Sequence, residues 1–224
     1  MSQLALKYIG ADKLPAKLSE FELERLFSLT PEEIREIRSR FRRDHHVTAG
    51  VQLVFLRVAG RAFDAYEVVP RALLAHLGRQ VEQEAPNIAS LRSLYRRRDT
   101  LNQHQQWARE YLGLDYPTDH QMRMLYVRMK EQAHQALSID ALTQFGARWL
   151  YCAKLVIPGE RSLRHDAVRA FMESEDQTLA TLEALVTKQE FRSWIGKLYE
   201  RRANSAMTQI EWLQTPLGND PPRR

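Results

Sequence analysis

The amino-acid sequence predicts an all-α protein, a multi-helix array with helix-turn-helix-like three-helix units. Apolar residues recur at helical spacing along most of the 224 residues, and several of these stretches begin with a capping signal. The nine glycines and nine prolines are few and lie mostly between the periodic stretches, whereas an all-β chain needs many turns. Apolar residues make up 44% of the chain, so a packed core is feasible and disorder is not expected.

Two capping boxes mark the first helices. Ser19 with Glu22, and Thr30 with Glu33, have the spacing at which the two side chains satisfy free N–H groups at a helix start. The second of these helices is expected to continue to about Arg43, because apolar residues repeat at helical spacing behind the box.

The next helix is expected at 48–60 and to be buried, because apolar residues surround nearly its whole circumference. Gly60 is the expected C-cap. After a loop at 61–69, three helices are expected in the stretch 70–113, with the last two joined by roughly four residues. That layout is typical of a helix-turn-helix unit, in which the last helix enters the major groove of DNA.

Pro117 and Thr118 form the predicted domain boundary. The sequence is therefore divided into a helical region at 1–115, a second helical domain at 116–214 and a flexible polar tail at 215–224. In the second domain, helices are expected to begin at the capping residues Thr118, Ser138 and Thr187, and a long helix is expected from about Ser162 to Val186.

The distribution of charge favours an anionic partner. The formal net charge is +5, and 26 of the 33 basic residues are arginine, whose planar fork fits phosphate and guanine edges. Residues 34–113 contain 14 arginines, no lysine and eight acids, whereas residues 1–33 contain four bases and six acids. An arginine-rich genome would produce the same composition, so the position of the arginines carries more weight than their number.

The last helix of the predicted unit, 100–112, is the candidate for reading DNA bases. Its thin apolar face is expected to consist of Leu101, Ala108, Tyr111 and Leu112. Asn and Gln can bond adenine bidentately, and Arg can do so with guanine. The residues expected to contact bases are Asn102, Gln103, Gln105, Gln106 and Arg109. The alternative is an ordinary amphipathic helix with a glutamine-rich solvated face.

Three sets of arginines are expected to contact DNA phosphates. The first set, directly before the readout helix, is Arg96, Arg97 and Arg98. The second set is Arg38, Arg42 and Arg43, in a cluster that also contains Arg40, His45 and His46. The third set, at the end of the apolar helix, is Arg57 and Arg61, which could instead anchor that helix end by pairing with carbonyls or acids. Solvated helix faces are the alternative for the second set.

The sequence predicts no catalytic centre, metal site or cofactor. Its seven histidines are scattered, and neither an H-E-x-x-H motif nor a glycine-rich phosphate loop occurs. The single cysteine, Cys152, lies in a stretch expected to face the core, where packing is a simpler role than nucleophilic attack. Neither a signal pattern nor an apolar run of about 18 residues occurs, so a bacterial cytoplasmic location and no membrane partner are expected.

Five segments of the sequence form a further pattern. They are L-S-E-F-E-L-E-R-L-F-S-L-T-P-E-E-I (18–34), A-G-V-Q-L-V-F-L-R-V-A-G-R (49–61), R-x-T-x-x-x-H (98–104) with L-G (112–113), V-I-P-G (156–159) and I-E-W-L-Q-T-P (210–216). Together they resemble the N-terminal region of transposases of the Tn-three family. The block at 49–61 is the most specific part of the resemblance, and the last third of the chain is the loosest.

Members of that family are large replicative transposases that form cointegrates. The resemblance implies that helical N-terminal domains bind the terminal inverted repeats of the transposon, while a distant acidic triad holds magnesium and cuts and joins strands. This chain would then be a non-catalytic DNA-binding module, and its partner would be the double-stranded terminal inverted repeat. The alternative is a protein-interaction or regulatory fragment that associates with a full-length transposase or with itself.

Overall fold

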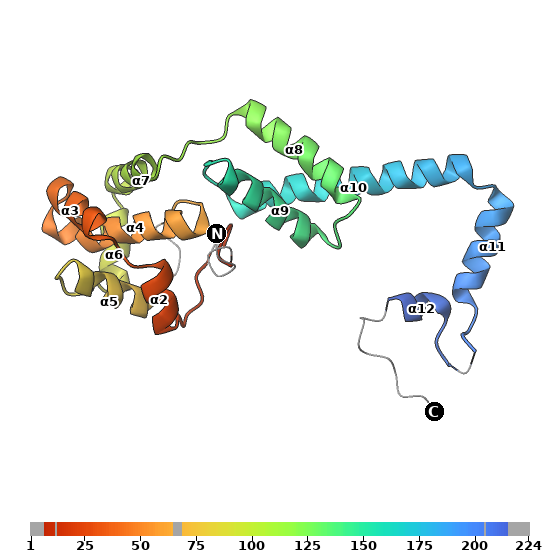
Figure 1. The fold of residues 1–224 in the computed structure, drawn as a ribbon, viewed down its shortest axis with the longest axis horizontal. Coiled ribbons are helices and arrows are strands. Elements are labelled where there is room, and N and C mark those ends of the chain that lie inside the picture. Colours follow the sequence, from red (N-terminus) through yellow and green to blue (C-terminus); the bar gives the residue numbers. More distant parts are fainter. Residues whose placement is uncertain (1–6, 12, 65–68, 204, 215–224) are drawn as a thin grey trace. The chain divides into compact units, whose positions relative to one another are not determined.

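The computed structural model describes residues 7–11, 13–64, 69–203 and 205–214. Over these residues the chain is helical and contains no strand, which confirms the predicted all-α array. Its elements are α2 (Glu20–Leu26), α3 (Pro31–Arg40), the short 3-10 helix η1 (Arg43–His45), α4 (His46–Ala59), α5 (Arg71–Gln80), α6 (Ile88–Tyr95), α7 (Arg98–Leu112), α8 (Asp119–Ala133), α9 (Ile139–Cys152), α10 (Glu160–Leu185), α11 (Lys188–Tyr199) and α12 (Gln209–Leu213). Figure 1 labels the α-helices. The predicted tail at 215–224 lies outside the described residues.

Side-chain caps form where the sequence predicts them. Ser19 accepts a hydrogen bond from the backbone N–H of Glu22, and the carboxylate of Glu22 bonds back to the backbone of Ser19. Thr30 and Glu33 form the same reciprocal pair at the start of α3. Further caps at the predicted positions are Thr118 on α8, Ser138 on α9 and Thr187 on α11. These local bonds fix where the helices begin.

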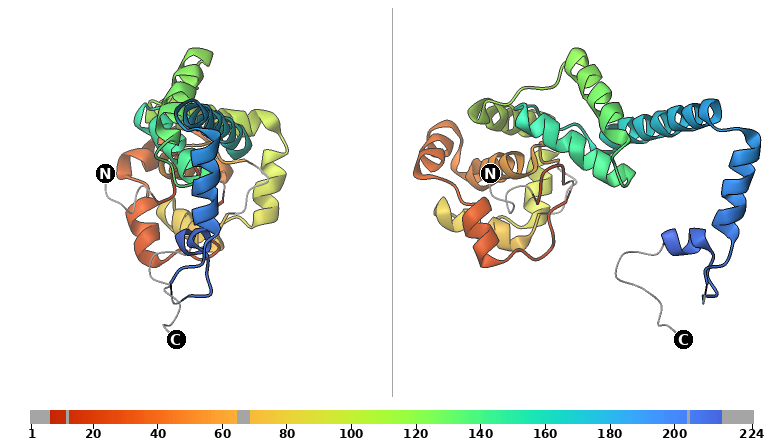
Figure 2. Two further views of the ribbon diagram at one scale, coloured as in Figure 1. Left: turned by 90° about the vertical axis from the view of Figure 1, so that its right-hand side faces the viewer. Right: turned by 45° about the vertical axis from the view of Figure 1, so that its right-hand side comes forward.

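Helix α4 is the centre of the first part of the chain. All of its residues except Arg57 are buried, as its apolar sequence predicts. The helix packs against α3, α5 and α7, and Figures 1 and 2 show these helices around it. Gly60 ends the helix with a φ of 73°, the left-handed conformation that favours glycine, so the predicted C-cap is confirmed.

The C-terminal end of α4 joins the segments on either side of the predicted domain boundary. The last carbonyls of a helix have no partner within the helix, so other groups must satisfy them. The N–H of Gly10 donates to the Ala59 carbonyl at 2.8 Å, and the N–H of Ile157 donates to the Gly60 carbonyl at 2.7 Å. The Tyr151 hydroxyl donates to the Arg57 carbonyl at 2.9 Å. These bonds tie α4 to α9 and to the segment after it.

The chain divides into two compact units, Met1–Glu173 and Ser174–Arg224, and the division falls within α10. The boundary predicted at 115/116 therefore lies inside the first unit. The physical reason is that Asp115, instead of starting a free linker, forms an isolated bridge with Leu155. Two apolar clusters share this unit, one around α4 and one among α8, α9 and the first part of α10.

Cys152 is exposed, which corrects the prediction that it faces the core. Helix α9 buries Leu142, Gly146, Ala147 and Leu150 instead. These positions share one helical face, and Cys152 lies at the last residue of the helix, away from that face.

The second unit, taken by itself, contains the end of α10, α11 and α12, with α11 packed on α12. Thr208 and Glu211 form a capping box at the start of α12, a signal that the sequence prediction missed. Among the described residues of this unit, only Ser174 is buried. Its apolar side chains are therefore largely exposed to solvent.

Candidate nucleic-acid interface

The two arginine clusters of the sequence meet at one groove in the first unit. The groove has a volume of about 800 Å³ and is called here the arginine groove. It is lined by the end of α3 and the loop after it, by η1, by α6 and by the start of α7. The lining residues are Arg40, Phe41, Arg42, Asp44, His45, Ser90, Ser93, Leu94, Arg97, Thr100 and Gln103.

Arg40, Arg42 and Arg97 give the arginine groove its positive charge. All three are exposed, and among the described residues no ion pair or hydrogen bond holds their guanidinium groups. The one acid of the lining, Asp44, lies 3.8 Å from the ring nitrogen of His45. An unpaired guanidinium can bind a phosphate without first breaking another ion pair, so the groove suits an anionic ligand.

The start of α7 adds a second positive feature to the groove. Its N-cap residue, Arg97, makes no side-chain capping bond, so among the residues that the structure describes no side-chain cap satisfies the free N–H groups of this end. The N-terminus of a helix also carries the positive end of the helix dipole, which stabilises a nearby anion. The structure therefore places an uncapped helix start and three arginines around one space.

The position of this helix start differs from the prediction. Helix α7 begins at Arg98 rather than at Thr100, and only Arg96 and Arg97 separate it from α6. The Thr-x-x-Gln pattern at 100–103 lies inside the helix and does not cap it. The connection between α6 and α7 is thus two residues long instead of roughly four. Arg97 alone takes an extended conformation, and it separates the last turn of α6 from the start of α7.

The inward face of α7 also differs from the prediction. The buried residues are His104, Trp107 and Ala108, whereas Tyr111, which was expected to face inward, is 38% exposed. The rings of His104 and Trp107 meet Phe41 edge to face, with ring centres 4.8 and 5.1 Å apart. The spacing of 104, 107 and 108 is a helical stripe, and this signal could have identified the buried face.

Three of the predicted base-contacting residues are exposed on α7. They are Asn102, Gln103 and Gln106, and Gln103 also lines the arginine groove. Gln106 donates a hydrogen bond to the carboxylate of Glu110 at 2.8 Å, one turn further along the helix. These three amides share a face of α7 with two exposed acids, Asp99 and Glu110.

The other two predicted base contacts, Gln105 and Arg109, are engaged within the protein. The amide of Gln105 donates to the Phe63 carbonyl at 2.8 Å. Arg109 donates to the Leu114 carbonyl at 3.1 Å, and its guanidinium carbon lies 5.2 Å from the centre of the Tyr116 ring. Both side chains satisfy the backbone of neighbouring loops, which corrects their assignment to the exposed face.

Six of the eight predicted phosphate contacts, all except Arg57 and Arg61, fall into three groups in the structure. Arg42 and Arg97 line the arginine groove, Arg43, Arg96 and Arg98 are exposed next to them in the sequence, and Arg38 is exposed and lies 3.3 Å from a carboxylate oxygen of Glu82. Arg40 lines the groove although it was not among the predicted contacts. Helix α3 ends at Arg40, sooner than predicted, because Phe41 turns to an extended backbone, and this turn places Arg40 and Arg42 on the same groove.

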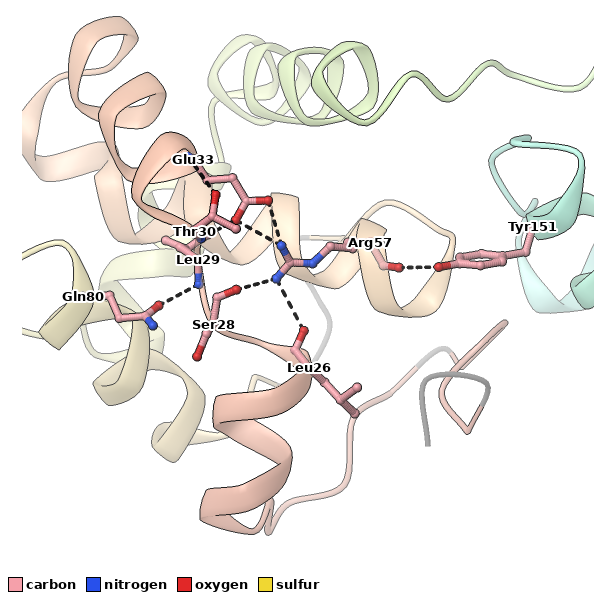
Figure 3. Close-up of polar contacts among 8 residues, drawn as sticks. All are labelled: Leu26, Ser28, Leu29, Thr30, Glu33, Arg57, Gln80 and Tyr151. Carbon is pink, nitrogen blue, oxygen red and sulfur yellow. Dashed lines mark hydrogen bonds and ion pairs between the residues drawn. The ribbon is translucent and has the colours of Figure 1, made fainter. Parts of the chain in front are cut away.

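Arg57 lies in an internal polar network, shown in Figure 3, and not on a face that is free to meet DNA. Its guanidinium donates to both carboxylate oxygens of Glu33, at 2.7 and 3.0 Å. It also donates to the carbonyls of Ser28, at 2.7 Å, and Leu26, at 3.4 Å. Arg57 thus takes the anchoring role that the sequence left as an alternative, while the phosphate contact of the half-buried Arg61 stays a prediction.

His104 is a buried neutral histidine next to the arginine groove. The Tyr95 hydroxyl donates to the Thr48 carbonyl at 3.0 Å, so its oxygen is free to accept from Nδ1 of His104 at 3.1 Å. The Nε2 atom of His104 is buried and has no hydrogen-bond partner among the described residues. Burial, and then repulsion by His45, lowers the pKa of His104 to about 4.

This histidine predicts a loss of stability in mild acid. The unfolded chain protonates His104 below its ordinary pKa of 6.5, whereas the folded chain resists protonation down to a pKa of about 4. The stabilising contribution is therefore complete above pH 6.5 and is lost as the pH falls toward 4. Between pH 7 and pH 5 the free energy of unfolding should fall by about 2 kcal/mol. Burial also lowers the pKa of His76, which adds to the same loss.

Urea unfolding at a series of pH values measures this dependence. His104→Leu should remove most of the change between pH 7 and pH 5, although it also costs stability at pH 7. His120→Leu, at an exposed position on α8, is the matched control and should leave the dependence intact. An unchanged pH dependence in His104→Leu would show that another group is responsible.

Comparison with known proteins identifies the family. Residues 10–170 match the family described as "Domain of unknown function (DUF4158)". Over 206 residues, which are 92% of this chain, the sequence is 33% identical to the "Transposase for insertion sequence element IS1071 in transposon Tn5271" of Comamonas testosteroni. The chain spans about a fifth of the length of that relative, 21%, and corresponds to its N-terminal region.

Within the described residues, no helix is both long and apolar enough to cross a bilayer. The family match extends over most of the chain and includes every residue that lines the arginine groove. The chain therefore belongs to the DUF4158 family, and it is related to the N-terminal region of a transposase.

Proposed function

We propose that this chain binds double-stranded DNA at the terminal inverted repeats of a transposon. The observation that carries the proposal is the arginine groove, where unpaired arginines from two distant parts of the sequence lie beside the exposed amides of α7. The relative named as a transposase supports DNA as the anion, because transposition acts on DNA.

The arginine groove holds the sugar-phosphate backbone in this proposal. Arg40, Arg42 and Arg97 neutralise phosphates, and the uncapped start of α7 adds backbone N–H donors. Such contacts bind any sequence and fix the position of the protein on the duplex. They make the affinity fall steeply as the salt concentration rises.

The exposed face of α7 reads base edges in the major groove in this proposal. Asn102, Gln103 and Gln106 are the exposed amides, and an amide side chain can bond the N6 and N7 atoms of adenine at once. Asn102 and Gln106 are one turn apart and lie on the same side of the helix. The role is recognition; we assign the cutting and joining of strands to the part of such a transposase that lies outside the matched fifth.

Sequence recognition is tested by comparing two duplexes of equal length at about 0.1 M salt. The wild-type chain should bind a duplex of its terminal inverted repeat more tightly than a scrambled duplex. Gln103→Ala should weaken binding to the repeat by about tenfold, in line with the 1–3 kcal/mol of a bidentate base contact, and leave the scrambled duplex unaffected. Fluorescence anisotropy with labelled duplexes gives both dissociation constants.

Gln135→Ala is the matched control, since Gln135 is an exposed glutamine outside α7. It should bind both duplexes as the wild type does. Equal binding of the wild type to the repeat and to the scrambled duplex would refute sequence-specific recognition. Equal loss on both duplexes in Gln103→Ala would move this residue from the base contacts to the backbone contacts.

A further inference from the structure

The second unit carries an apolar stripe on each of two helices, and neither stripe is covered. On α11, Phe191 is 53% exposed, Trp194 48% and Ile195 39%. On the end of α10, Leu179 is 56% exposed and Leu182 41%. Large side chains at i, i+3 and i+4 form a continuous strip along a helix, and uncovered strips of this kind mark interaction surfaces.

Charged residues border one edge of each stripe, and they are acidic on α10 and basic on α11. On α10, Asp176 and Glu183 are seven residues apart and border the side of Leu179. The α10 segment 174–185 contains no basic residue. On α11, Lys188 and Arg192 are four residues apart and border its apolar stripe. All four charged side chains are exposed, so each edge is available to a partner of opposite charge.

Within the described part of this unit, neither stripe covers the other, because the apolar side chains of both stay exposed. Only Val186 and Thr187 separate α10 from α11, and Thr187 is held in an extended conformation as the N-cap of α11. Helix α11 packs on α12 instead, and its apolar stripe stays exposed in that contact. The stripe on α10 and the stripe on α11 are thus complementary in charge, but within one chain they do not pack on each other.

We infer that two copies of this chain associate through their second units, with α11 of each copy packed on the end of α10 of the other. The acidic, apolar strip on α10 of the second copy faces the basic, apolar strip on α11 of the first copy. In the same way, α11 of the second copy faces α10 of the first copy. A two-fold axis makes both contacts at once, which closes the assembly as a dimer. The inference goes beyond DNA binding and does not depend on it.

Sedimentation velocity of the full chain over a range of concentrations tests the association. The expected result is a species of twice the 26.2 kDa chain mass that dissociates on dilution. Trp194→Glu should raise the dissociation constant of the dimer by at least about tenfold, because it places a charge in the buried strip. Leu137→Glu is the matched control, since Leu137 is an apolar residue that is 98% exposed outside both strips.

Charge reversal identifies the pairing. One variant carries Asp176→Lys and Glu183→Lys, and the other carries Lys188→Glu and Arg192→Glu. Each variant alone should remain monomeric, because like charges face each other in both contacts. An equimolar mixture should form the dimer again, because both contacts of the mixed pair then join opposite charges. Circular dichroism of each variant should show unchanged helix content.

Two outcomes would overturn the inference. One is a wild-type chain that stays monomeric at about 100 µM, a concentration at which a dimer with a dissociation constant of about 1 µM would be almost fully formed. If such a monomer associates only when a full-length transposase is added, the stripes belong to that protein. The other is a dimer that both charge-reversed variants form as well as the wild type does, which would place the contact elsewhere.

Discussion

Replacing Arg57 by methionine should lower the free energy of unfolding by about 3 kcal/mol, the largest effect expected of a single polar substitution in this protein. Arg57 donates to both carboxylate oxygens of Glu33 and to two backbone carbonyls. The side chain of Glu33 is only 7% exposed. Methionine fills a similar volume but leaves this buried carboxylate without its cation, and an unpaired buried charge costs more than the pair contributes.

A double-mutant cycle separates the lost pair from lost packing. Glu33→Gln removes the charge and keeps an oxygen that can accept the N–H of Thr30, which Glu33 accepts at 2.7 Å. Adding Glu33→Gln to Arg57→Met should therefore restore about 1 kcal/mol or more relative to Arg57→Met alone. Urea unfolding followed by circular dichroism gives each value. Additive losses in the cycle would contradict a direct interaction.

Arg38→Ala is the matched control for Arg57→Met. Arg38 also pairs with a glutamate, Glu82, but both side chains are exposed, at 40% and 81%. Exposed ion pairs contribute about 0–1 kcal/mol, so this variant should be nearly as stable as the wild type. A similar loss in both variants would mean that the effect follows from net charge and not from burial.

The sequence predicts most helix starts because the signals are local. A capping box such as that of Thr30 and Glu33 places both bonding partners within four residues, so its geometry follows from the helix itself. The burial of α4 is predicted for a similar reason, since a helix that is apolar all round can only lie inside the protein. Helix ends are less predictable: α3 ends at Arg40, sooner than its apolar spacing indicates.

The domain boundary and the arginine groove depend on contacts between distant residues. Proline and threonine at 117–118 mark a turn, but only the structure shows that Ile157 and Tyr151 return to satisfy the carbonyls at the end of α4. The sequence likewise identifies two arginine clusters without showing that Arg42 and Arg97 line one groove. Gln105 and Arg109 have the right chemistry for base contacts, but in the structure they donate hydrogen bonds to carbonyls of neighbouring loops.

Removing the three arginines of the groove should weaken DNA binding by about 100-fold at low salt, the largest effect expected on function. The variant carries Arg40→Ala, Arg42→Ala and Arg97→Ala. Phosphate contacts do not distinguish sequences, so the loss should be the same on the terminal repeat and on a scrambled duplex. Because these side chains are exposed and unpaired, stability should change by less than about 0.5 kcal/mol.

The salt dependence of binding shows whether the three arginines contact phosphates directly. Each phosphate contact contributes about one unit to the slope of the logarithm of affinity against the logarithm of salt concentration. The slope should therefore become shallower by about three units in the triple variant. Anisotropy titrations between about 0.05 and 0.3 M salt cover the range in which this difference is large.

A second triple variant, Arg25→Ala, Arg79→Ala and Arg123→Ala, removes the same net charge from exposed positions outside the groove. Charge at a distance acts mainly on the rate of encounter and is screened within about 10 Å at 0.1 M salt. This control should therefore keep a steep slope and lose only a small part of its affinity. If it loses as much as the groove variant, DNA is attracted by the overall positive charge and the arginine groove has no special role. If the groove variant alone loses affinity and slope, arginines from two distant segments of the sequence form one phosphate-binding surface.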